Sequence, residues 1–337
     1  MSNAENVYPI DSQWLIDVIL NYGYTLEDIS SVIGIKVTAN NTQRLPLHKN
    51  NSLLEWLSQI LGDRYFGLKL ARTIPATVFG GATALGYHSE NLEEGILNLV
   101  SYSHSISPAI EFELTVSEGI AKLTYFNHLP PELYSIQDHE LTAAQCVYSF
   151  RLILHENWQP LKVEFSHAEP ESLSEYKSIF GDKVFFNAGS SSVYFDESLL
   201  KHKVASADPY VQEIIKKQVI ELTKSISKDQ ALPSLVRHFI TKCIGTDQCN
   251  VVDAALELCM SRRNLTKKLA AYGTSFTSIK GEVTLFLAKQ ALSSTQTRIS
   301  DISLNLGYAD LSSFDRSFKK LTGLSPRDYR HNKLDES

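Results

Sequence analysis

The sequence predicts a two-domain protein: an α+β N-terminal domain, then an all-α C-terminal domain with two helix-turn-helix units joined by a long helix. The chain has 337 residues, which is more than one hydrophobic core usually holds. Strand-like alternation occurs only before residue 200, whereas the chain from residue 230 onward shows short helical patterns alone. We therefore expect an N-terminal domain at 1–205, a helical linker at 206–229, a C-terminal domain at 230–332 and a disordered tail at 333–337.

Helical patterns open the chain. Apolar residues recur at helical spacing from Asp11 to Gly34, with a break expected at Gly23, and again over 51–70. A connection rich in Gly, Pro and Ala follows at 74–87, and a third helix is expected over 91–105.

Strand signals come next. Residues 110–116 and 120–126 alternate apolar and polar side chains around Ser117-Glu118-Gly119, which predicts a β-hairpin with one buried face. A helix is expected over 138–155, and further strands at 161–166, 184–187 and 192–195. The helix expected over 208–227 is either a domain linker or half of a dimer contact, and the sequence leaves both open.

The C-terminal region repeats one plan of two short helices across a turn. In the second copy, residues 297–320, the expected break is Gly307-Tyr308 and the buried positions are Ile299, Ile302, Leu306, Phe314 and Phe318. In the first copy, residues 252–269, the expected turn is Cys259-Met260 and the buried positions are Ala255, Leu258, Leu265 and Leu269. A helix over 276–292 joins the copies, and a capped helix over 325–329 closes the domain.

Charge separates the two regions. The chain has a net charge of -6, but from residue 229 onward 15 Lys and Arg face 11 Asp and Glu, a net of +4. Only this part has the sign that a phosphate backbone attracts. The outward face of each second helix is polar and basic, as direct base readout requires. The candidate DNA-binding residues are Arg262, Arg263, Asn264, Thr266, Lys267, Ser312, Ser313, Asp315, Arg316, Lys319 and Lys320.

The stretches AALELCMSRRNLTKKLAAYGTSF and RISDISLNLGYADLSSFDRSFKKLTGLSPRDYR resemble the AraC/XylS family of bacterial transcription regulators. The resemblance covers about residues 230–330, and it implies a seven-helix domain with two helix-turn-helix units. It also implies that Arg263, Thr266 and Lys267 contact bases from the first unit. In the second unit the implied base contacts are Ser312, Asp315 and Arg316.

The N-terminal part resembles the arabinose-binding type of N-terminal domain in the same family. The matching segments are FGGATALGYHSENLEEGI, WQPLKVEFSHAEPESLSEYKSIFG and VFFNAGSSSVYFDESLL. This resemblance implies that the domain receives a small-molecule effector and mediates dimerisation. We therefore expect a transcription regulator, an activator, that binds promoter DNA, its effector and RNA polymerase as a homodimer. The alternative is a ligand-independent regulator whose N-terminal domain serves only protein contacts.

Other chemistry has little support in the sequence. The four cysteines lack CxxC spacing, no HExxH or GxSxG occurs, and no apolar run is long enough for a membrane span. We expect a cytoplasmic protein that is not an enzyme and has no metal, cofactor or membrane partner. Glycine-rich 79–86 lacks the Lys-Ser/Thr of a phosphate loop and predicts a turn with close backbone approach.

Aromatic residues are dense in the N-terminal domain, and strands favour them, so most are expected in the core. A few are expected to line an apolar effector pocket. Arg151 lies on an otherwise apolar helix, where it could bind a ligand carboxylate or pair with a nearby acid. The candidate pocket residues are Phe79, Tyr87, Tyr102, Phe112, Tyr125, Arg151 and Phe165.

Overall fold

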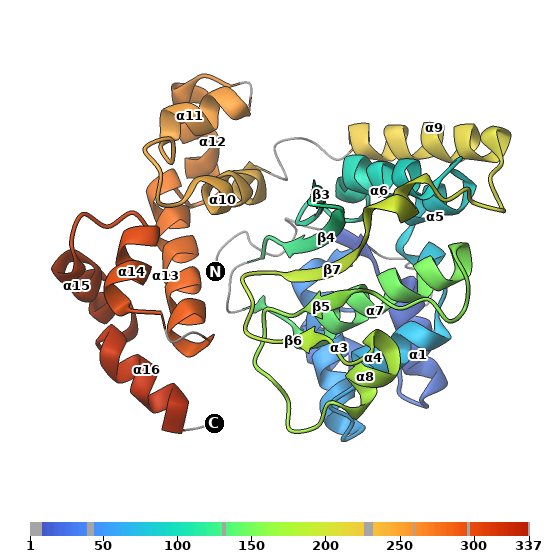
Figure 1. Cartoon of the computed structure of the whole chain (residues 1–337), viewed down its shortest axis with the longest axis horizontal. Coiled ribbons are helices and arrows are strands. Elements are labelled where there is room, and N and C mark those ends of the chain that lie inside the picture. The colour runs from blue at the N-terminus through green and yellow to red at the C-terminus, as the bar shows by residue number, and fades with distance from the viewer. Residues whose placement is uncertain are drawn as a thin grey trace.

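The two domains lie side by side in the computed structural model (Figure 1). The structure describes residues 9–38, 44–129, 133–225, 232–258, 260–294 and 297–335. One large hydrophobic core occupies the N-terminal domain, and two smaller cores occupy the C-terminal domain. Within the described ranges, no helix has the length and apolar character needed to cross a membrane.

The chain begins with two short helices, α1 (Gln13–Asn21) and α2 (Leu26–Ile33). The predicted break at Gly23 is confirmed, since its φ of 88° lies in the left-handed region that glycine adopts without strain. Thr25 and Asp28 form a capping box that begins α2. Strands β1 (Pro9–Asp11) and β2 (Arg44–Pro46) form a small antiparallel pair that the sequence did not reveal.

Two predictions for the next segment are wrong. The single helix expected over 51–70 is two helices, α3 (Leu47–Ile60) and α4 (Phe66–Thr73), because the chain turns at Gly62 with a φ of 63°. The expected connection at 74–87 contains a 3-10 turn, η2 (Ala76–Phe79), and a helix, α5 (Gly81–His88).

The glycines of α5 serve close helix packing rather than a turn. A Cβ at Gly81 would overlap the Val219 side chain of α9, and a Cβ at Gly95 would lie 3.1 Å from the Gly86 carbonyl oxygen. The predicted close backbone approach is therefore present, but it joins helices. Helix α6 (Leu92–Ile106) begins at Asn91, whose side chain accepts from the Glu94 amide.

A five-stranded sheet follows, with the order β3-β4-β7-β5-β6. The predicted hairpin is confirmed as β3 (Ile110–Ser117) and β4 (Ile120–Asn127), joined through Glu118 and Gly119, which both have positive φ. Only β5 and β6 pair in parallel. The remaining elements are α7 (Ile136–Ile153), β5 (Lys162–Glu164), α8 (Ser174–Phe180), β6 (Val184–Phe185), β7 (Ser191–Asp196) and η4 (Glu197–Lys201). The sequence did not anticipate α8.

Helix α9 (Pro209–Ser225) occupies the segment predicted as a linker or dimer contact. It lies across α5 and α6 at the upper edge of the N-terminal domain, where Val219 is buried (Figure 1). It therefore packs as part of that domain. The end of the predicted linker, 226–229, lies outside the described residues.

The C-terminal domain consists of helices within the described ranges. They are α10 (Leu232–Cys243), α11 (Val251–Glu257), α12 (Arg262–Ala271), α13 (Phe276–Ser294), α14 (Ile299–Asn305), α15 (Leu311–Thr322) and α16 (Pro326–Asp335). Helix α13 supplies Ile279 and Val283 to one core and Ala288 and Leu292 to the other. The expected tail from residue 333 begins as the last turn of α16, which stays helical to Asp335. Cys259, in the expected first turn, and residues 336–337 lie outside the described residues.

Candidate nucleic-acid interface and ligand cavity

Helix α12 presents a basic and polar face to solvent. Ser261 begins the helix by accepting a hydrogen bond from the Asn264 amide, and Leu265 and Leu269 are buried in the first core. The opposite face leaves the predicted residues exposed, namely Arg262, Arg263, Asn264, Thr266 and Lys267. Burial of one stripe therefore orients the cationic stripe outward.

Helix α15 repeats this arrangement with a different cap. The Asp310 carboxylate accepts from the Ser313 amide at 2.7 Å and from the Ser313 hydroxyl at 2.9 Å, and these bonds lower the pKa of Asp310. The Arg316 guanidinium donates to the Ser313 hydroxyl oxygen at 3.4 Å. Ser313 therefore links the cap to Arg316, whereas Phe314 and Phe318 are buried beneath. The exposed residues of this face are Ser312, Arg316, Lys319 and Lys320, with Asp315 half-buried.

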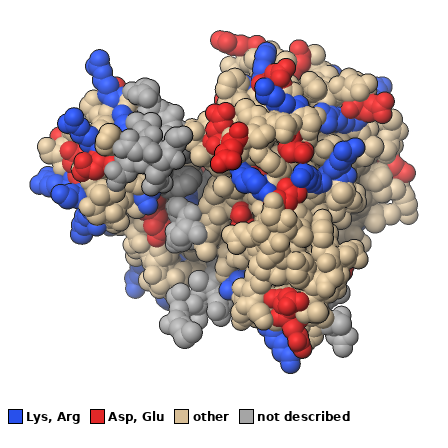
Figure 2. Space-filling view, turned by 90° about the horizontal axis from the view of Figure 1, so that it is seen from below, with Lys and Arg blue, Asp and Glu red and all other residues tan. Residues whose placement is uncertain are grey.

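The loop between α10 and α11 contacts the turn between α14 and α15 through backbone atoms. Gly245, after α10, and Gly307, in the turn between α14 and α15, have φ values of 84° and 81°. A Cβ on Gly307 would lie 3.0 Å from the Gly245 Cα, and a Cβ on Gly245 would overlap the Asn305 carbonyl oxygen. This contact and helix α13, which contributes to both cores, connect the part of the domain that holds α12 to the part that holds α15. In Figure 2 the C-terminal domain, on the left, carries Lys and Arg side chains at its outer edge.

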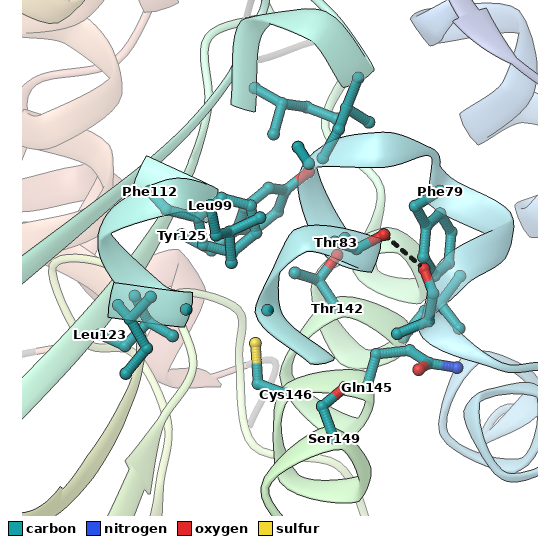
Figure 3. Close-up of a pocket in the computed structure, with 18 of the residues that line it drawn as sticks. Phe79, Thr83, Leu99, Phe112, Leu123, Tyr125, Thr142, Gln145, Cys146 and Ser149 are labelled. Atoms are coloured by element: carbon teal, nitrogen blue, oxygen red, sulfur yellow. Dashed lines mark hydrogen bonds between the residues drawn. The ribbon is translucent and has the colours of Figure 1, made fainter. Parts of the chain in front are cut away.

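The N-terminal domain contains an apolar cavity of about 120 Å³. Figure 3 shows that it lies among α5, α6, α7 and the β3-β4 hairpin, with Phe79 and Leu99 on opposite sides. Helix α7 lines it with one stripe at helical spacing. That stripe consists of Asp138, Leu141, Thr142, Gln145, Cys146, Ser149, Phe150 and Ile153.

Most polar groups of this lining already bond within the protein. The Gln145 amide nitrogen donates to the carbonyl oxygens of Ala71 and Ile74, and the Tyr87 hydroxyl donates to Ser149. The Tyr125 hydroxyl donates to Asp138 at 2.7 Å. Burial raises the pKa of Cys146 to about 12, so its thiol is neutral at physiological pH.

Four predicted pocket residues line the cavity: Phe79, Tyr87, Phe112 and Tyr125. The other three do not. Phe165 is fully buried against Tyr176 and Phe180, and half-buried Tyr102 packs against the domain core. Sequence analysis missed the α7 stripe, although its polar residues recur at helical spacing.

Arg151 does not border the cavity, contrary to the prediction that it binds a ligand carboxylate there. Its guanidinium donates to the carbonyl oxygens of Trp158 at 2.8 Å and Ile179 at 2.5 Å, and it does not line the cavity. The alternative of pairing with an acid is not what the structure shows either. These backbone carbonyls accept from its guanidinium and connect α7 to the segment before β5 and to the last turn of α8.

A second hollow, of about 90 Å³, lies between the domains. The N-terminal domain lines it with residues that include Tyr125, Asn127 and Tyr134, and the C-terminal domain contributes Arg237, Thr241, Val283 and Leu287. Arg237 of α10 is held by an ion pair with Glu282 of α13. Tyr125 borders both the cavity and this cleft, so its ring lies in the wall between them.

Titratable residues are buried in the N-terminal domain, and one of them, His139, packs against the Tyr125 ring. Burial raises the pKa of Glu140 to about 7, against the opposing effect of Arg64, whose guanidinium lies 2.7 Å away. Burial lowers the pKa of His139 to about 3 and that of His167 to about 4. No group of three or more His, Cys, Asp or Glu suited to a metal occurs in the part of the chain that the structure describes.

The chain was compared with known proteins. Residues 31–204, just over half of the chain, match the arabinose-binding domain of AraC transcription regulator, N-terminal, and residues 254–332 match a helix-turn-helix domain. The chain is 27% identical over 332 residues to the ornithine utilization regulator of Pseudomonas aeruginosa, covering 97% of each.

The chain is also similar to two further proteins. The chain is 26% identical to the transcriptional regulator VirS of Mycobacterium tuberculosis, over 79% of this chain and 78% of VirS. The crystal structure of the transcriptional regulator CdpR from Pseudomonas aeruginosa aligns with a TM-score of 0.44 at 20% identity, over 91% of this chain and 96% of CdpR. With these family matches, the chain belongs to the AraC family of DNA-binding transcription regulators.

Proposed function

We propose that α12 and α15 are the recognition helices of two helix-turn-helix units, joined by α13, that enter successive major grooves of one operator. One observation carries this proposal: both helices bury an apolar stripe in separate cores and expose a polar, basic face. Helix α13 has 19 residues, which gives about 28 Å at 1.5 Å per residue. With the width of the helix pairs added, this length suits grooves about 34 Å apart.

The first unit combines base reading with affinity. Arg263, Thr266 and Lys267 lie at i, i+3 and i+4 on the exposed face, where arginine and lysine can donate to guanine and the threonine methyl can meet thymine. Arg262 and Asn264 flank them. These side chains extend from a helix whose first turn is capped by Ser261.

In the second unit, hydrogen bonds orient Arg316, the main base-contacting residue. Asp310 binds Ser313, and Ser313 accepts from Arg316, so the arginine is partly oriented before DNA arrives. Ser312 and Asp315 complete the base-reading face, and Lys319 and Lys320 contact phosphates. The role of Ser313 is to position Arg316.

Control by a small-molecule effector is the second part of the proposal. The apolar cavity supports it, and Tyr125 supplies a route, since its ring lies between the cavity and the cleft lined by α10 and α13. An effector acts by favouring one arrangement of this wall, and hence one placement of the DNA-binding domain. The protein then activates transcription as a homodimer in contact with RNA polymerase.

Binding-site selection with the full-length protein tests the DNA contacts. We expect a two-part motif, and Arg316→Ala is expected to relax one position of it by about 1–3 kcal/mol of discrimination. Lys320→Ala is the matched control on the same helix, and it is expected to weaken binding evenly across sequences. An unchanged motif with Arg316→Ala would refute the base-reading role.

Thermal-shift screening tests effector control, because a true ligand stabilises the folded state by mass action. Each stabilising compound is then added to the operator complex. A compound that stabilises the protein yet leaves its DNA affinity unchanged would favour the ligand-independent regulator.

A further inference from the structure

The N-terminal cavity restricts the chemistry of its ligand through size, charge and one buried polar atom. Its volume of about 120 Å³ is somewhat below that of an apolar cavity of about 150 Å³ that accommodates benzene. The space therefore suits one ring or a short branched chain. A sugar with several hydroxyl groups has too few partners here, because the lining is largely apolar.

Charge is excluded by the lining. Among the described residues that border the cavity there is no Lys, Arg or His, so a carboxylate ligand has no counter-ion. Asp138 is the acid of the lining, and its Oδ2 already accepts from the Tyr125 hydroxyl and from the Asn127 amide at 2.9 Å. An ammonium group would compete with these two donors for a carboxylate that burial already disfavours in its charged form.

One residue that lines the cavity has an acceptor atom without a hydrogen-bond donor among the described residues. Asn50 of α3 is buried and borders the cavity, and its Oδ1 has no hydrogen-bond partner in the described part of the chain. A buried acceptor without a partner is costly, and a ligand that supplies an O–H or N–H removes this cost. The remaining polar groups described above are already bonded and require nothing from a ligand.

We infer that the cavity binds a small, uncharged, single-ring molecule that donates one hydrogen bond to Asn50 Oδ1. This deepens the effector part of the proposed function and rests on it only for the regulatory consequence. The apolar ring lies among residues that include Phe79, Leu99 and Phe112 (Figure 3).

The test uses the full-length protein and four probes of equal ring size: phenol, toluene, benzoate and benzylammonium. Binding is measured by thermal shift and by titration calorimetry. We expect phenol to bind roughly tenfold more tightly than toluene, because only phenol satisfies Asn50. We expect no binding of benzoate or benzylammonium at the same concentrations. Tighter binding of either ion, or equal binding of phenol and toluene, would overturn the inference.

Asn50→Leu sharpens the test, with Asn51→Leu as the matched control. Asn51 is the next residue of α3, is equally buried and also lacks partners for its amide atoms, but it does not line the cavity. We expect Asn50→Leu to abolish the preference for phenol over toluene and Asn51→Leu to retain it. Loss of the preference in both variants would contradict a specific bond to Asn50, and if a variant fails to fold, the probe series on the unmodified protein still decides.

A substitution that fills the cavity tests whether the ligand binds there. Leu99→Trp places a larger side chain in the cavity, whereas Leu97→Trp makes the same change at an exposed position of the same helix. Only the first is expected to abolish phenol binding; binding that survives it places the ligand elsewhere.

Operator affinity is then measured with and without phenol. Binding of phenol with unchanged operator affinity would leave the cavity chemistry standing and refute effector control. If the protein binds its operator but none of the four probes, the inference about the cavity ligand is refuted and the DNA-binding proposal stands.

Discussion

The two domains handle charge in opposite ways. The N-terminal domain buries Glu140, His139, His167 and Asp138 in or beside its core. In the C-terminal domain, the cations of α12 and α15 lie on the outer surface, above cores of apolar side chains. The first domain is therefore expected to respond to protons and small molecules, and the second to salt and DNA.

The largest expected effect is on stability, and it shows whether the two domains unfold independently. Phe318→Ala removes a fully buried ring from the second C-terminal core and is expected to cost about 3–5 kcal/mol of unfolding free energy. Chemical denaturation that follows each domain separately should show the loss in the C-terminal transition only. A matching loss in the N-terminal transition would show that the domains unfold together.

Salt concentration is the next condition expected to affect the two domains differently. If Lys319 and Lys320 contact phosphates as proposed, operator affinity should fall by at least about tenfold between 50 and 200 mM salt. The unfolding free energy of the N-terminal domain should change little over the same range, since its buried ionic groups are weakly screened and its exposed ion pairs contribute little to stability. Anisotropy titrations measure the first quantity, and a flat salt profile there would remove the phosphate contacts from the proposal.

The contact between the helix pairs is tested by Gly245→Ala. The change forces a left-handed alanine against the Asn305 carbonyl, so we expect a loss of about 1–3 kcal/mol of stability and weaker binding to the two-part operator. Gly273→Ala is the control, since its φ is 69° but no atom lies within 4 Å of the added Cβ. Equal effects of the two changes would mean that the backbone contact contributes nothing.

The smallest expected effect is on pH dependence. Because the pKa of His139 falls to about 3 in the folded state from 6.5, the unfolded state binds the proton more readily as the pH drops. Stability from this group is complete above pH 6.5 and is lost toward pH 3, at up to about 1.4 kcal/mol per pH unit. Glu140, whose pKa is raised, acts in the opposite sense between pH 4.5 and 7.

The measurement is the difference between the pH profiles of His139→Gln and the unmodified protein, which isolates this one group. Glutamine can still bond Ser191 but does not take up the proton, so the unmodified protein should lose stability relative to the variant below pH 6.5. Parallel profiles would contradict a buried neutral imidazole.

The helix pairs and the hairpin were predictable because local periodicity determines them. Phe314 and Phe318 lie four residues apart on one helical face, and residues 110–127 alternate strictly enough to set the strand register. The cavity was predictable only in part. Phe112 and Tyr125 were identified from composition, but the packing of α5 against α6 and α9 depends on contacts distant in sequence.

Arg151 shows most clearly what local sequence could not predict. An arginine on an apolar helix predicts a buried partner, but its sequence neighbours do not tell whether that partner is a ligand, an acid or a carbonyl. The carbonyl of Ile179 lies 28 residues away and becomes a partner only after α8 has packed. The split of the helix expected over 51–70 has a similar origin, since a glycine within a helical pattern is not always a break.

The backbone contact between Gly245 and Gly307 has a consequence for the architecture of the operator. If the two units bind one duplex as proposed, this contact sets their angular phase about the duplex axis. Inserting about five base pairs between the half-sites turns one of them to the far side of the duplex, since a full turn takes about 10–10.5 base pairs. On that proposal the backbone contact opposes such a rotation of one unit, so we expect the operators of this protein to keep the helical phase of their two half-sites.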